Sequence, residues 1–574
     1  MSYNVLAINP GHNGSVALVK DGVLDFYLEE ERLSRHKYDG NPFRGILEAV
    51  ERCEIHALVL GGTSSENLPK LTWTGEEPHL ALVRKFYPNV TFYNCGDNHH
   101  LGHAAGAFFN SGFDTAVAVV VDGAGSYHNT RVNDEENAPE VGGFECESII
   151  LCKEDITFQP LYKSYGSNKS FRFSGNIRGV DYLFDDATTI TKVYEAVSDY
   201  LGFGFIEAGK TMGLAPYGKY DDQILDLFVD GRANKNLVIP YYPAGAFIDH
   251  GRRTYLAPPK NKKEWHNNSD LVTSQMKNIA WTVQQQTQKL VGDLVEKAID
   301  MSGLNKVVIA GGYGLNCVCN YYLKQRFPNV EIFVDPVSHD GGTSIGLAKL
   351  IYTHHCKQND IPAFAEKLHT LYLGPSRFDQ ISEVSEDDEF SVKDVSYSDV
   401  AELISNQNIV SLFQSRSEAG PRALGNRSIL FDPRAEDGKD KVNVVKGREW
   451  FRPFAGSVLA EEVHEWFDLA GMDESPHMMY AVNVRGSKLG DVPAITHVDG
   501  TCRIQTVTEG QNEHYYKLIK AFKELTGCPI LFNTSFNLAG DPLVETIDDA
   551  LNTLRKSGIQ YMYLPEVGKL VCKK

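Results

Sequence analysis

Three passages of the chain repeat one pattern, a short apolar run that ends in a glycine-rich turn. The runs span residues 5–9, 115–121 and 306–310. Each has the length and apolar continuity of a buried β-strand. A glycine turn after a strand presents backbone N–H groups to an anion and lets the backbone approach it closely. Three such turns, with helical patterns between them, predict a nucleotide cleft between duplicated α/β halves.

The length of the chain predicts more than one domain. A chain of 574 residues exceeds the roughly 250–300 residues at which a single core stops growing. Residues 357–395 are largely polar and acidic, which is typical of a boundary, and the remainder has the size of one α/β domain. We therefore expect an α/β protein with domains at 1–365 and 366–574. The longest helical pattern covers residues 270–302 and reads as a packing helix.

Charge and cysteine usage narrow the class of protein. The net charge is −19, which favours a small-molecule enzyme, because a nucleic-acid binder usually carries a basic face. The ten cysteines form no CxxC pair, so free thiols and a cytoplasmic location are expected. The start of the chain has no signal-peptide pattern, and no window is apolar enough for a membrane span.

Two histidines in HHLGH share a helical spacing that suits a metal. His99 and His103 are four residues apart, so on a helix they lie on one face. Asp122 and Asp340, each beside a glycine turn, are candidate carboxylate partners. Two imidazoles and two carboxylates suit a first-row divalent metal. The spacing alone fits a pair of core or solvated histidines as well.

Two further segments of the N-terminal part are polar or glycine-rich. Residues 207–218, EAGKTMGLAPYG, place Lys210 among glycines where a phosphate can bind, but the spacing is not that of a Walker A loop. Residues 163–180 are rich in Ser, Asn, Gly and Arg and read as an exposed insertion. The run from Glu29 to Arg32 reads as the start of a solvated helix.

The densest cluster of cations lies in the C-terminal part, within apolar surroundings. It contains Arg422, Arg427, Lys446, Arg448, Arg452 and Arg503. Buried cations need anionic partners. The polar residues Asn533 and Ser535 follow the apolar run at 529–532. The cluster favours a phosphate-rich ligand over a set of structural salt bridges.

These motifs together resemble one family, the O-carbamoyltransferases of antibiotic tailoring and nodulation-factor modification. The resemblance spans nearly the whole chain. It is carried, in order, by INPGHNGSVALVKDG, EEERLSRHK, HHLGHAAGAF, VVVDGAGS, MGLAPYG, AGGYGLNCVCN, DGGTSIG, GPRALGNRSIL, REWFRPFAGSVL, HVDGTCRIQTV and LFNTSFNLAGDPLV.

The resemblance implies a fold and a two-step reaction. The N-terminal domain is similar to actin-like enzymes (a duplicated ribonuclease H-like fold), and the C-terminal domain is similar to the YrdC-like fold. The second domain is expected to form carbamoyl-adenylate from carbamoyl phosphate and ATP, with Mg²⁺ accompanying the ATP. The first is expected to transfer the carbamoyl group to a hydroxyl of a small-molecule acceptor. A bound Fe²⁺, or another first-row divalent metal, is implied beside the adenylate.

The resemblance also assigns residues by motif. The implied metal ligands are His99, His103, Asp122 and Asp340. His12 and Lys37 map to the acceptor and carbamoyl end of the transfer site. Cofactor contacts in the first domain fall on Lys210, Gly311, Gly312 and Asn316. The adenylation site is implied to contain Arg422, Lys446, Arg448, Arg452, Arg503, Asn533 and Ser535, with Lys446 and Ser535 as its leading residues.

Some positions depart from the family pattern. The first loop has Asn13-Gly14 where Asp-Ala is usual, and Ser126 stands where Glu is common. Gly341 follows Asp340 in place of a second Asp. The metal set is intact, so these changes concern the identity of the acceptor.

Three other functions remain in view. A tRNA-modifying threonylcarbamoyl enzyme shares both domain types but needs a basic surface. A sugar kinase or chaperone-type ATPase leaves the C-terminal cations unexplained. An inactive nucleotide-binding scaffold leaves the intact metal and adenylation residues unexplained. No nucleic-acid or membrane partner is expected, and a homodimer is allowed. The acceptor, the metal and the pathway are left open.

Overall fold

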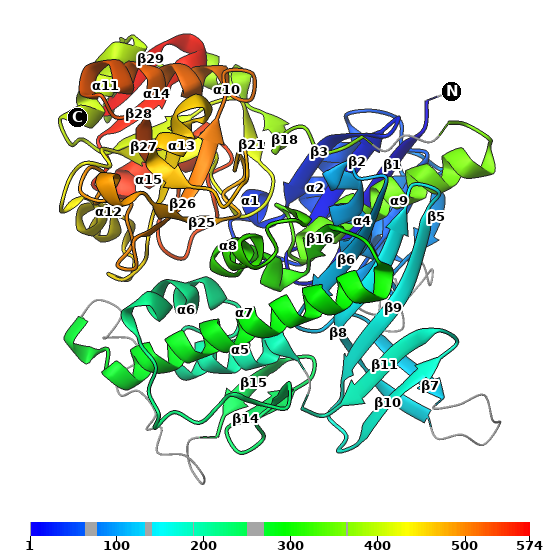
Figure 1. Ribbon diagram of the computed structural model, residues 1–574. Coiled ribbons are helices and arrows are strands. Elements are labelled where there is room, and N and C mark those ends of the chain that lie inside the picture. Colours follow the sequence, from blue (N-terminus) through cyan, green and yellow to red (C-terminus); the bar gives the residue numbers. More distant parts are fainter. Residues whose placement is uncertain (1, 63–76, 132–139, 188, 250–268, 363–365) are drawn as a thin grey trace. The chain divides into compact units, whose positions relative to one another are not determined.

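The computed structural model describes residues 2–62, 77–131, 140–187, 189–249, 269–362 and 366–574 (Figure 1). These residues divide into two compact units. Unit 1 holds the described residues of Met1–Glu30, Tyr38–Lys263 and Val272–His369. Unit 2 holds Thr370–Lys574, Glu31–Lys37 and the described residues of Glu264–Leu271. A short segment from the N-terminal region therefore belongs to unit 2.

The first sheet of unit 1 has five strands in the order β3-β2-β1-β4-β5. Its strands are β1 (Asn4–Asn9), β2 (Ser15–Lys20), β3 (Val23–Glu29), β4 (Ala57–Leu60) and β5 (Thr91–Asn94). Strands β1, β2 and β3 pair antiparallel, whereas β4 and β5 run parallel to β1. Every residue of β1 is buried, which explains the continuous apolar run at 5–8.

The second sheet of unit 1 repeats this topology. Its central strands are β6 (Thr115–Val121), β8 (Glu140–Lys153), β9 (Thr157–Gly166), β16 (Lys306–Ala310) and β17 (Glu331–Val334). They follow the order β9-β8-β6-β16-β17, with β6, β8 and β9 antiparallel and β16 and β17 parallel to β6. The same strand order in both halves confirms the predicted duplication and its ribonuclease H-like, actin-like pattern.

Two helices that follow corresponding strands cross each other closely. Helix α4 (His99–Ser111) follows β5, and α9 (Thr343–Gln358) follows β17. A Cβ placed on Gly346 of α9 would lie 1.9 Å from the carbonyl oxygen of Gly102 on α4. The two backbones approach this closely only because both positions lack a side chain. The crossing fixes the start of α4 beside the turn that precedes α9.

The prediction of an exposed insertion at 163–180 is wrong for most of these residues. They include the end of β9 and the strand β10 (Arg172–Ile177), which pairs with β11 (Val180–Asp185). Alternate residues of β10 are exposed, while Phe173 packs against the buried cluster of Tyr165 and Phe184. The polar residues of this strand lie on its outer face. Their number made the two-residue alternation of a strand hard to recognise in the sequence.

The remaining helices of unit 1 pack on its two sheets and on one another. They are α2 (Phe43–Val50), α3 (Pro78–Arg84), α5 (Ile190–Tyr200), α6 (Ala208–Leu214), α7 (Ser274–Ser302) and α8 (Cys317–Arg326). Helix α7 is long and buries one face, as the helical pattern at 270–302 predicts. Short 3₁₀ turns follow α6 (η1, Ala215–Tyr217), β16 (η3, Gly312–Leu315) and β17 (η4, Asp340–Gly342).

Unit 2 is built on a ten-stranded mixed sheet in the order β19-β29-β28-β20-β22-β27-β23-β26-β25-β24. Its strands are β19 (Phe390–Asp394), β20 (Val410–Phe413), β22 (Arg427–Phe431), β23 (Ala455–Leu459), β24 (Phe467–Asp468), β25 (Ala481–Val484), β26 (Thr501–Val507), β27 (Ile530–Ser535), β28 (Tyr561–Leu564) and β29 (Lys569–Lys573). Two short strands, β18 (Tyr372–Ser376) and β21 (Arg416–Glu418), pair separately.

The helices of unit 2 complete its α/β fold. They are α1 (Glu31–Ser34), α10 (Phe378–Ser382), α11 (Tyr397–Ser405), α12 (Gly438–Lys446), α13 (Val463–Trp466), α14 (Glu513–Thr526) and α15 (Ile547–Lys556). One core cluster joins residues of α15 to Phe413, Ile429 and Met562 of three strands. The α/β class is therefore confirmed in both units.

Two expectations about the whole chain can be compared with the structure. All ten cysteines are unpaired, and seven of them are buried, as expected of free core thiols. Within the described part of the chain, no helix has the length and apolarity needed to cross a membrane.

Candidate functional site

Helix α4 presents two histidines from its first turns in unit 1. The backbone N–H groups of His99 and His100, which the helix leaves without an internal partner, donate to the Ser126 hydroxyl and the Glu145 carboxylate. Because His99 and His103 are four residues apart, their rings lie on one face, and their Nε2 atoms are 3.1 Å apart. His100 points elsewhere and contacts the Ser148 hydroxyl through Nδ1 at 2.7 Å.

Two carboxylates reach the same place from the ends of two strands. Asp122 follows β6, and its Oδ2 lies 3.4 Å from Nε2 of His99. Asp340 begins η4 after β17, and its Oδ1 lies 3.7 Å from His99 and 3.9 Å from His103. The four ligand atoms all lie within 4.8 Å of one another. The structure thus brings together the four residues that the sequence assigned to a metal.

In this cluster the two aspartates favour a positive charge on His99, and that charge disfavours a second one on His103. Burial alone would lower the pKa of His99, but its hydrogen bonds with Asp122 and Asp340 raise that pKa well above the usual value. Burial and the charge on His99 lower the pKa of His103 to about 4. The pKa of Asp122 stays well below its usual range because the histidine charges outweigh its burial.

The donor set fits a divalent metal. Two imidazole nitrogens that face each other at 3.1 Å cannot both keep a proton between them, so a shared cation suits their lone pairs. The second nitrogen of His99, Nδ1, is buried and has no hydrogen-bond partner among the described residues. Two nitrogens and two oxygens are ligands that first-row divalent metals accept, so these residues do not decide between Fe²⁺ and its neighbours.

The glycine turns border the metal cluster from the neighbouring strand. The N–H of Gly312 donates to Oδ1 of Asp122 at 3.1 Å. Gly311 has a φ of 86°, and a Cβ there would lie 2.3 Å from the carbonyl oxygen of Val121, so the turn can pack over the end of β6 only with glycine. Asn316 caps α8, accepting from the N–H of Cys319 at 3.0 Å. Its amide also pairs with that of Gln284.

His12 is the other predicted residue near the metal cluster. It lies in the exposed loop after β1 and stacks on Tyr38 with ring centroids 5.2 Å apart. Its charge helps to lower the pKa of Asp340, although burial opposes this shift. Lys210 lies on α6, 3.6 Å from the Glu207 carboxylate.

The sequence did not reveal a buried ion pair beside the Asp122 turn. Both carboxylate oxygens of Glu195 accept from Nζ of Lys192, at 3.1 and 2.8 Å. A Cβ on Gly123, which follows Asp122, would lie 2.7 Å from the Glu195 carboxylate. Burial raises the pKa of Glu195, with Asp122 and Asp340 adding to the shift. The only sequence signal for this pair was that Lys192 and Glu195 are three residues apart, and such pairs are common on solvated helices.

Lys446 is the buried cation at the centre of the unit 2 cluster. It ends α12 and is 2% exposed. Its ammonium donates to the Ser535 carbonyl oxygen and to the Asn537 carbonyl and side-chain oxygens at 2.9 and 3.0 Å. The Ser535 hydroxyl lies 3.5 Å away and donates to Asn537 at 2.7 Å. Asn537, which the sequence analysis did not single out, orients both predicted residues.

Other cations of unit 2 act on Lys446. Burial lowers the pKa of Lys446 far below its usual value, and the charges of Arg448, Arg452 and Lys37 lower it further. Arg448 donates to the Thr534 hydroxyl at 3.3 Å. Burial and repulsion both disfavour the charged amine, so an anion at this place would stabilise its charged form.

Lys37 lies in a short segment that groups with unit 2. The resemblance placed it in the transfer site of the N-terminal domain. The structure assigns Glu31–Lys37 to unit 2, where the charge of Lys37 acts on Lys446. Its neighbour along the chain, Tyr38, belongs to unit 1.

The loop that carries Arg422 is held by a carboxylate that the sequence analysis did not identify as structural. Oε1 of Glu418 accepts from the backbone N–H groups of Leu424, Asn426 and Arg427, at 2.7, 2.8 and 3.1 Å. Arg427 is fully buried, its guanidinium donates to backbone carbonyls, and it lies 3.7 Å over the Phe413 ring. These are the contacts of a residue that serves the fold.

Two more predicted residues line the middle of the unit 2 sheet. Asn533 on β27 is fully buried and donates to the Ser457 hydroxyl at 2.9 Å and to the Ala423 carbonyl at 3.2 Å. Arg503 on β26 lies opposite Ala455 of β23, and Ala455 in turn lies opposite Asn533. The sheet thus places Arg503 and Asn533 in register on the two strands that flank β23.

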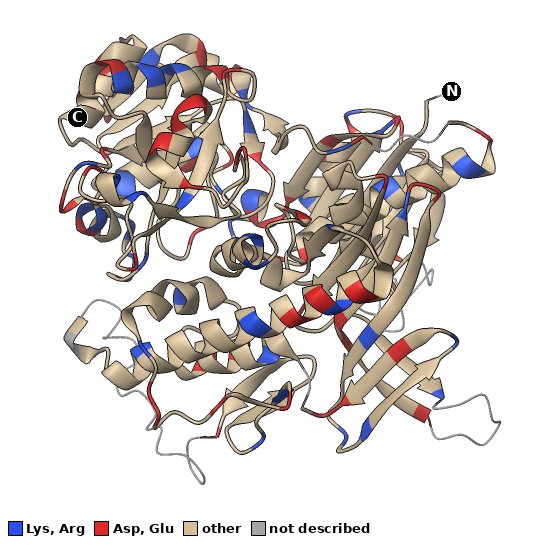
Figure 2. Cartoon of the chain, viewed as in Figure 1, with Lys and Arg blue, Asp and Glu red and all other residues tan. Residues whose placement is uncertain are grey.

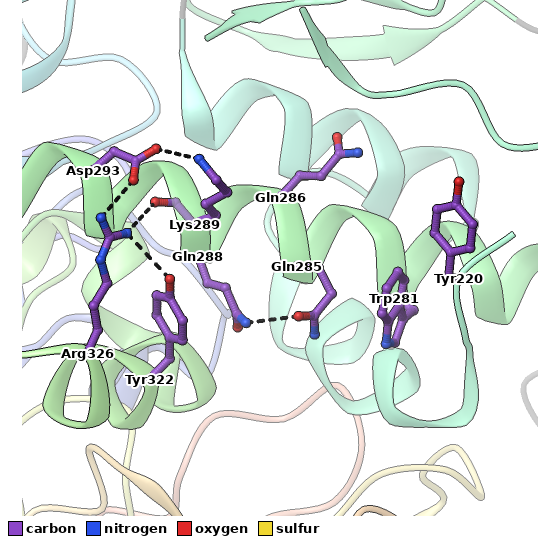
Figure 3. Close-up of a pocket in the computed structure, with 9 residues that line it drawn as sticks. All are labelled: Tyr220, Trp281, Gln285, Gln286, Gln288, Lys289, Asp293, Tyr322 and Arg326. Carbon is purple, nitrogen blue, oxygen red and sulfur yellow. Dashed lines mark hydrogen bonds and ion pairs between the residues drawn. The ribbon is translucent and has the colours of Figure 1, made fainter. Parts of the chain in front are cut away.

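A separate groove in unit 1 contains none of the predicted site residues (Figure 3). Its volume is about 680 Å³, and it runs along α7. Lys289 and Arg326 both pair with Asp293 at 2.9 Å at one end of it. Tyr220 and Trp281 stand edge to face at its other end, with ring centroids 6.4 Å apart.

Family profiles match both units of the chain. The profile described as the carbamoyltransferase N-terminus matches residues 70–349. The profile described as the carbamoyltransferase C-terminus matches residues 401–572. Together they cover most of the described chain and both clusters of site residues, apart from the first loop and Glu31–Lys37.

Curated relatives extend over the whole length. The nodulation protein NolNO of Sinorhizobium fredii is 30% identical over 98% of this chain and 79% of its own length. The 3'-hydroxymethylcephem-O-carbamoyltransferase of Amycolatopsis lactamdurans is 27% identical over 97% of both chains. The enzyme of the same name from Streptomyces clavuligerus is 27% identical, again over 97% of both chains. A solved HypF structure is 14% identical with a TM-score of 0.30, covering 61% of this chain and 55% of its own, which is too remote to carry an argument.

Proposed function

Because this chain belongs to the O-carbamoyltransferase family and is a carbamoyltransferase, we propose that it carbamoylates a hydroxyl of a small molecule at the expense of ATP. The observation that carries the proposal is the presence, in one chain, of two different clusters. Unit 1 holds the metal-type cluster of two histidines and two aspartates. Unit 2 holds a buried lysine among further cations.

Unit 2 is the proposed site of carbamoyl-adenylate formation. Water cleaves carbamoyl phosphate to carbamate and phosphate. An oxygen of carbamate then attacks the α-phosphorus of ATP, and pyrophosphate leaves with Mg²⁺. The phosphates carry negative charge, and this charge grows on the pyrophosphate as it leaves. The cations proposed to stabilise it are Lys446, Arg448 and Arg452. The Ser535 hydroxyl and Asn537 hold the Lys446 ammonium in one direction.

Unit 1 is the proposed site of transfer. The oxygen of the acceptor hydroxyl attacks the carbamoyl carbon, AMP leaves, and the hydroxyl proton passes to a base. His12, whose charge acts on Asp340, is the residue proposed to face the acceptor hydroxyl and the carbamoyl group. A metal held by His99, His103, Asp122 and Asp340 would act as a Lewis acid toward the adenylate or the acceptor oxygen. The N–H of Gly312 holds Asp122 for that role.

The acceptor is proposed to be a small hydroxylated molecule. Two of the relatives are named for a hydroxymethyl cephem acceptor. A neutral hydroxyl needs no strongly basic surface. Figure 2 shows lysines and arginines interspersed with acidic residues along the drawn parts of both units, and the net charge is −19.

The second candidate function, tRNA threonylcarbamoylation, makes a different prediction. Affinity for tRNA would fall steeply with salt, because phosphate contacts release counterions. A filter-binding titration from low to physiological salt distinguishes the two. We expect no saturable tRNA binding at physiological salt.

The proposal is tested with a panel of hydroxylated acceptors. The full chain is loaded with Fe²⁺ and incubated with ATP, Mg²⁺, carbamoyl phosphate and each acceptor, and the products are followed by mass spectrometry. We expect one acceptor class to gain one carbamoyl group, with AMP and pyrophosphate formed in equal amounts. Carbamoylation that proceeds equally without ATP would contradict the proposal.

A further inference from the structure

The segment Glu31–Lys37, which we call the strap, is a part of the N-terminal sequence that is embedded in unit 2. Its neighbours Glu30 and Tyr38 belong to unit 1. The charge run around Arg32 has the composition of a solvated helix start. Arg32 is nevertheless only 3% exposed, so this side chain is buried although His36 and Lys37 at the end of the strap are exposed.

Arg32 joins the strap to the loop that carries Arg422. Its Nη2 donates to the carbonyl oxygen of Gly420 at 2.7 Å. The loop itself is held by Glu418, as described above. A buried guanidinium needs compensating charge. Burial raises the pKa of fully buried Glu545, and the charges of Arg427, Arg377 and, to a smaller extent, Arg32 oppose that rise.

Arg35 joins the strap to the loop that follows Ser535. Its guanidinium donates to the carbonyl oxygens of Leu543 and Pro542 at 2.6 and 2.9 Å. Its Nε lies 3.4 Å from the Asp549 carboxylate. Three contacts from one planar group fix both the position and the direction of the side chain, which a lysine cannot reproduce.

The strap ends at Lys37, after the two arginines that contact the loops of unit 2. Lys37 follows Arg35 by two residues and is exposed. Its charge acts on buried Lys446 together with the charges of Arg448 and Arg452. An exposed lysine on a free loop would sample many directions, whereas two anchored arginines upstream limit where its amine can lie.

We propose that Arg32 and Arg35 are positioning residues for adenylate formation, which hold the strap so that Lys37 supplies a phosphate-binding cation to the site of unit 2. This inference rests on the proposed function of unit 2. The two arginines contact backbone carbonyls and, for Arg35, the Asp549 carboxylate, so they act through Lys37 and through the two loops that they hold.

The test is a double-mutant cycle on the full-length protein. The assay is exchange of labelled pyrophosphate into ATP in the presence of carbamoyl phosphate, which reports adenylate formation without any acceptor. We expect Arg35→Ala and Lys37→Met each to raise the KM for ATP about tenfold or more, the scale of a misplaced binding group. The double variant should match Lys37→Met, because Arg35 then has nothing left to position. Effects that multiply would overturn the proposal.

Two further variants separate positioning from folding. In Arg35→Lys the new side chain can donate to one carbonyl at a time. Its KM for ATP should therefore lie between those of Arg35→Ala and the native protein. Arg44→Ala removes an arginine of unit 1 that pairs with Glu30 at 3.1 Å, and it should exchange like the native protein. If Arg35→Ala does not accumulate as folded protein, the same cycle is run with Arg35→Lys, and the same criterion of non-additivity decides.

The outcomes also separate this inference from the proposed function. A native protein that shows no carbamoyl phosphate-dependent exchange contradicts the proposed function itself. A native protein that exchanges, with an Arg35→Ala variant of unchanged KM, contradicts the role of the strap and leaves the proposed function standing.

Discussion

At the residue scale, a proton and a metal compete for the same atoms of unit 1. His99 has a raised pKa because Asp122 and Asp340 lie against it. At neutral pH and without metal, this imidazole is therefore protonated. A metal ligand must be neutral, so binding has to release that proton.

This competition predicts the pH dependence of metal affinity. Below the raised pKa of His99, each unit of pH increase should lower the apparent Kd about tenfold, because one proton leaves for each metal bound. The direction of this pH dependence follows from the raised pKa of His99. At lower pH more of the imidazole is protonated, so the site binds the metal more weakly. Calorimetry in buffers of different ionisation enthalpy should report about one proton released. A Kd independent of pH between pH 6 and 8 would contradict it.

A second residue-scale prediction concerns His103. Replacing His103 with Ala removes one of two nitrogen ligands and should abolish both metal retention and carbamoyl transfer. Pyrophosphate exchange should remain, because that step is assigned to unit 2. His100→Asn is the matched control on the same helix, since His100 points toward Ser148, and it should keep the metal. Metal content by mass spectrometry decides; full occupancy in His103→Ala would rule out this ligand set.

Sequence and structure agree unevenly at this scale. The helical period alone places His99 and His103 on one face, so that pair was predictable. The ion pair of Lys192 and Glu195 was not, since its meaning depends on the approach of the Gly123 turn. The sequence grouped Arg427 with the cations expected to bind phosphate, but it donates to backbone carbonyls. Local sequence cannot distinguish a buried structural arginine from one that binds phosphate.

At the element scale, the crossing of α4 and α9 sets the geometry of the metal cluster. Helix α4 carries both histidines, and η4 places Asp340 at the start of α9. The closest approach is at Gly346, where a methyl group would meet the Gly102 carbonyl at 1.9 Å. The helices must therefore move apart to admit any side chain.

Gly346→Ala is expected to weaken both the fold and the metal site. Overpacking of this kind typically costs about 1–3 kcal/mol, and separation of the helices should lower metal affinity as well. Gly510→Ala is the control, because its new methyl group would have no neighbour within 4 Å. Thermal unfolding with and without metal is the measurement. An unchanged Tm in Gly346→Ala would show that the crossing is not tight in solution.

The elements were predictable where their contacts are local. The strands at 115–121 and 306–310 coincide with β6 and β16, because buried strands have a continuous apolar signature. The fate of the strap was not predictable, since Arg32 meets Gly420, a partner 388 positions away. The strand β10 was also missed, because its inward Phe173 alternates with exposed polar residues.

At the scale of the whole molecule, the two units are assigned different steps. The metal-type cluster lies in unit 1, and the buried Lys446 lies in unit 2. Variants in one unit should therefore leave the partial reaction of the other intact. The division at residue 370 lies close to the 365/366 boundary expected from composition. The seven residues of the strap and the described residues of Glu264–Leu271 are exceptions that composition could not signal.

Lys446→Met gives the whole-molecule prediction for unit 2. It removes the cation that Ser535 and Asn537 orient, and pyrophosphate exchange should fall by about a hundredfold or more, the scale of a lost charge-stabilising group. Metal content should not change. Lys441→Met is the matched control on α12, since Lys441 pairs with exposed Asp437 and should exchange normally. Loss of metal in Lys446→Met would contradict the division of labour.

The most direct measurement needs no knowledge of the acceptor. Purified full-length protein is incubated with ATP, Mg²⁺ and labelled pyrophosphate, with and without carbamoyl phosphate, and label in ATP is counted. Reversible formation of carbamoyl-adenylate predicts exchange that depends strictly on carbamoyl phosphate, persists in His103→Ala and disappears in Lys446→Met. Exchange that is absent from the native protein, or that is equal without carbamoyl phosphate, would contradict the assignment of an adenylating carbamoyltransferase.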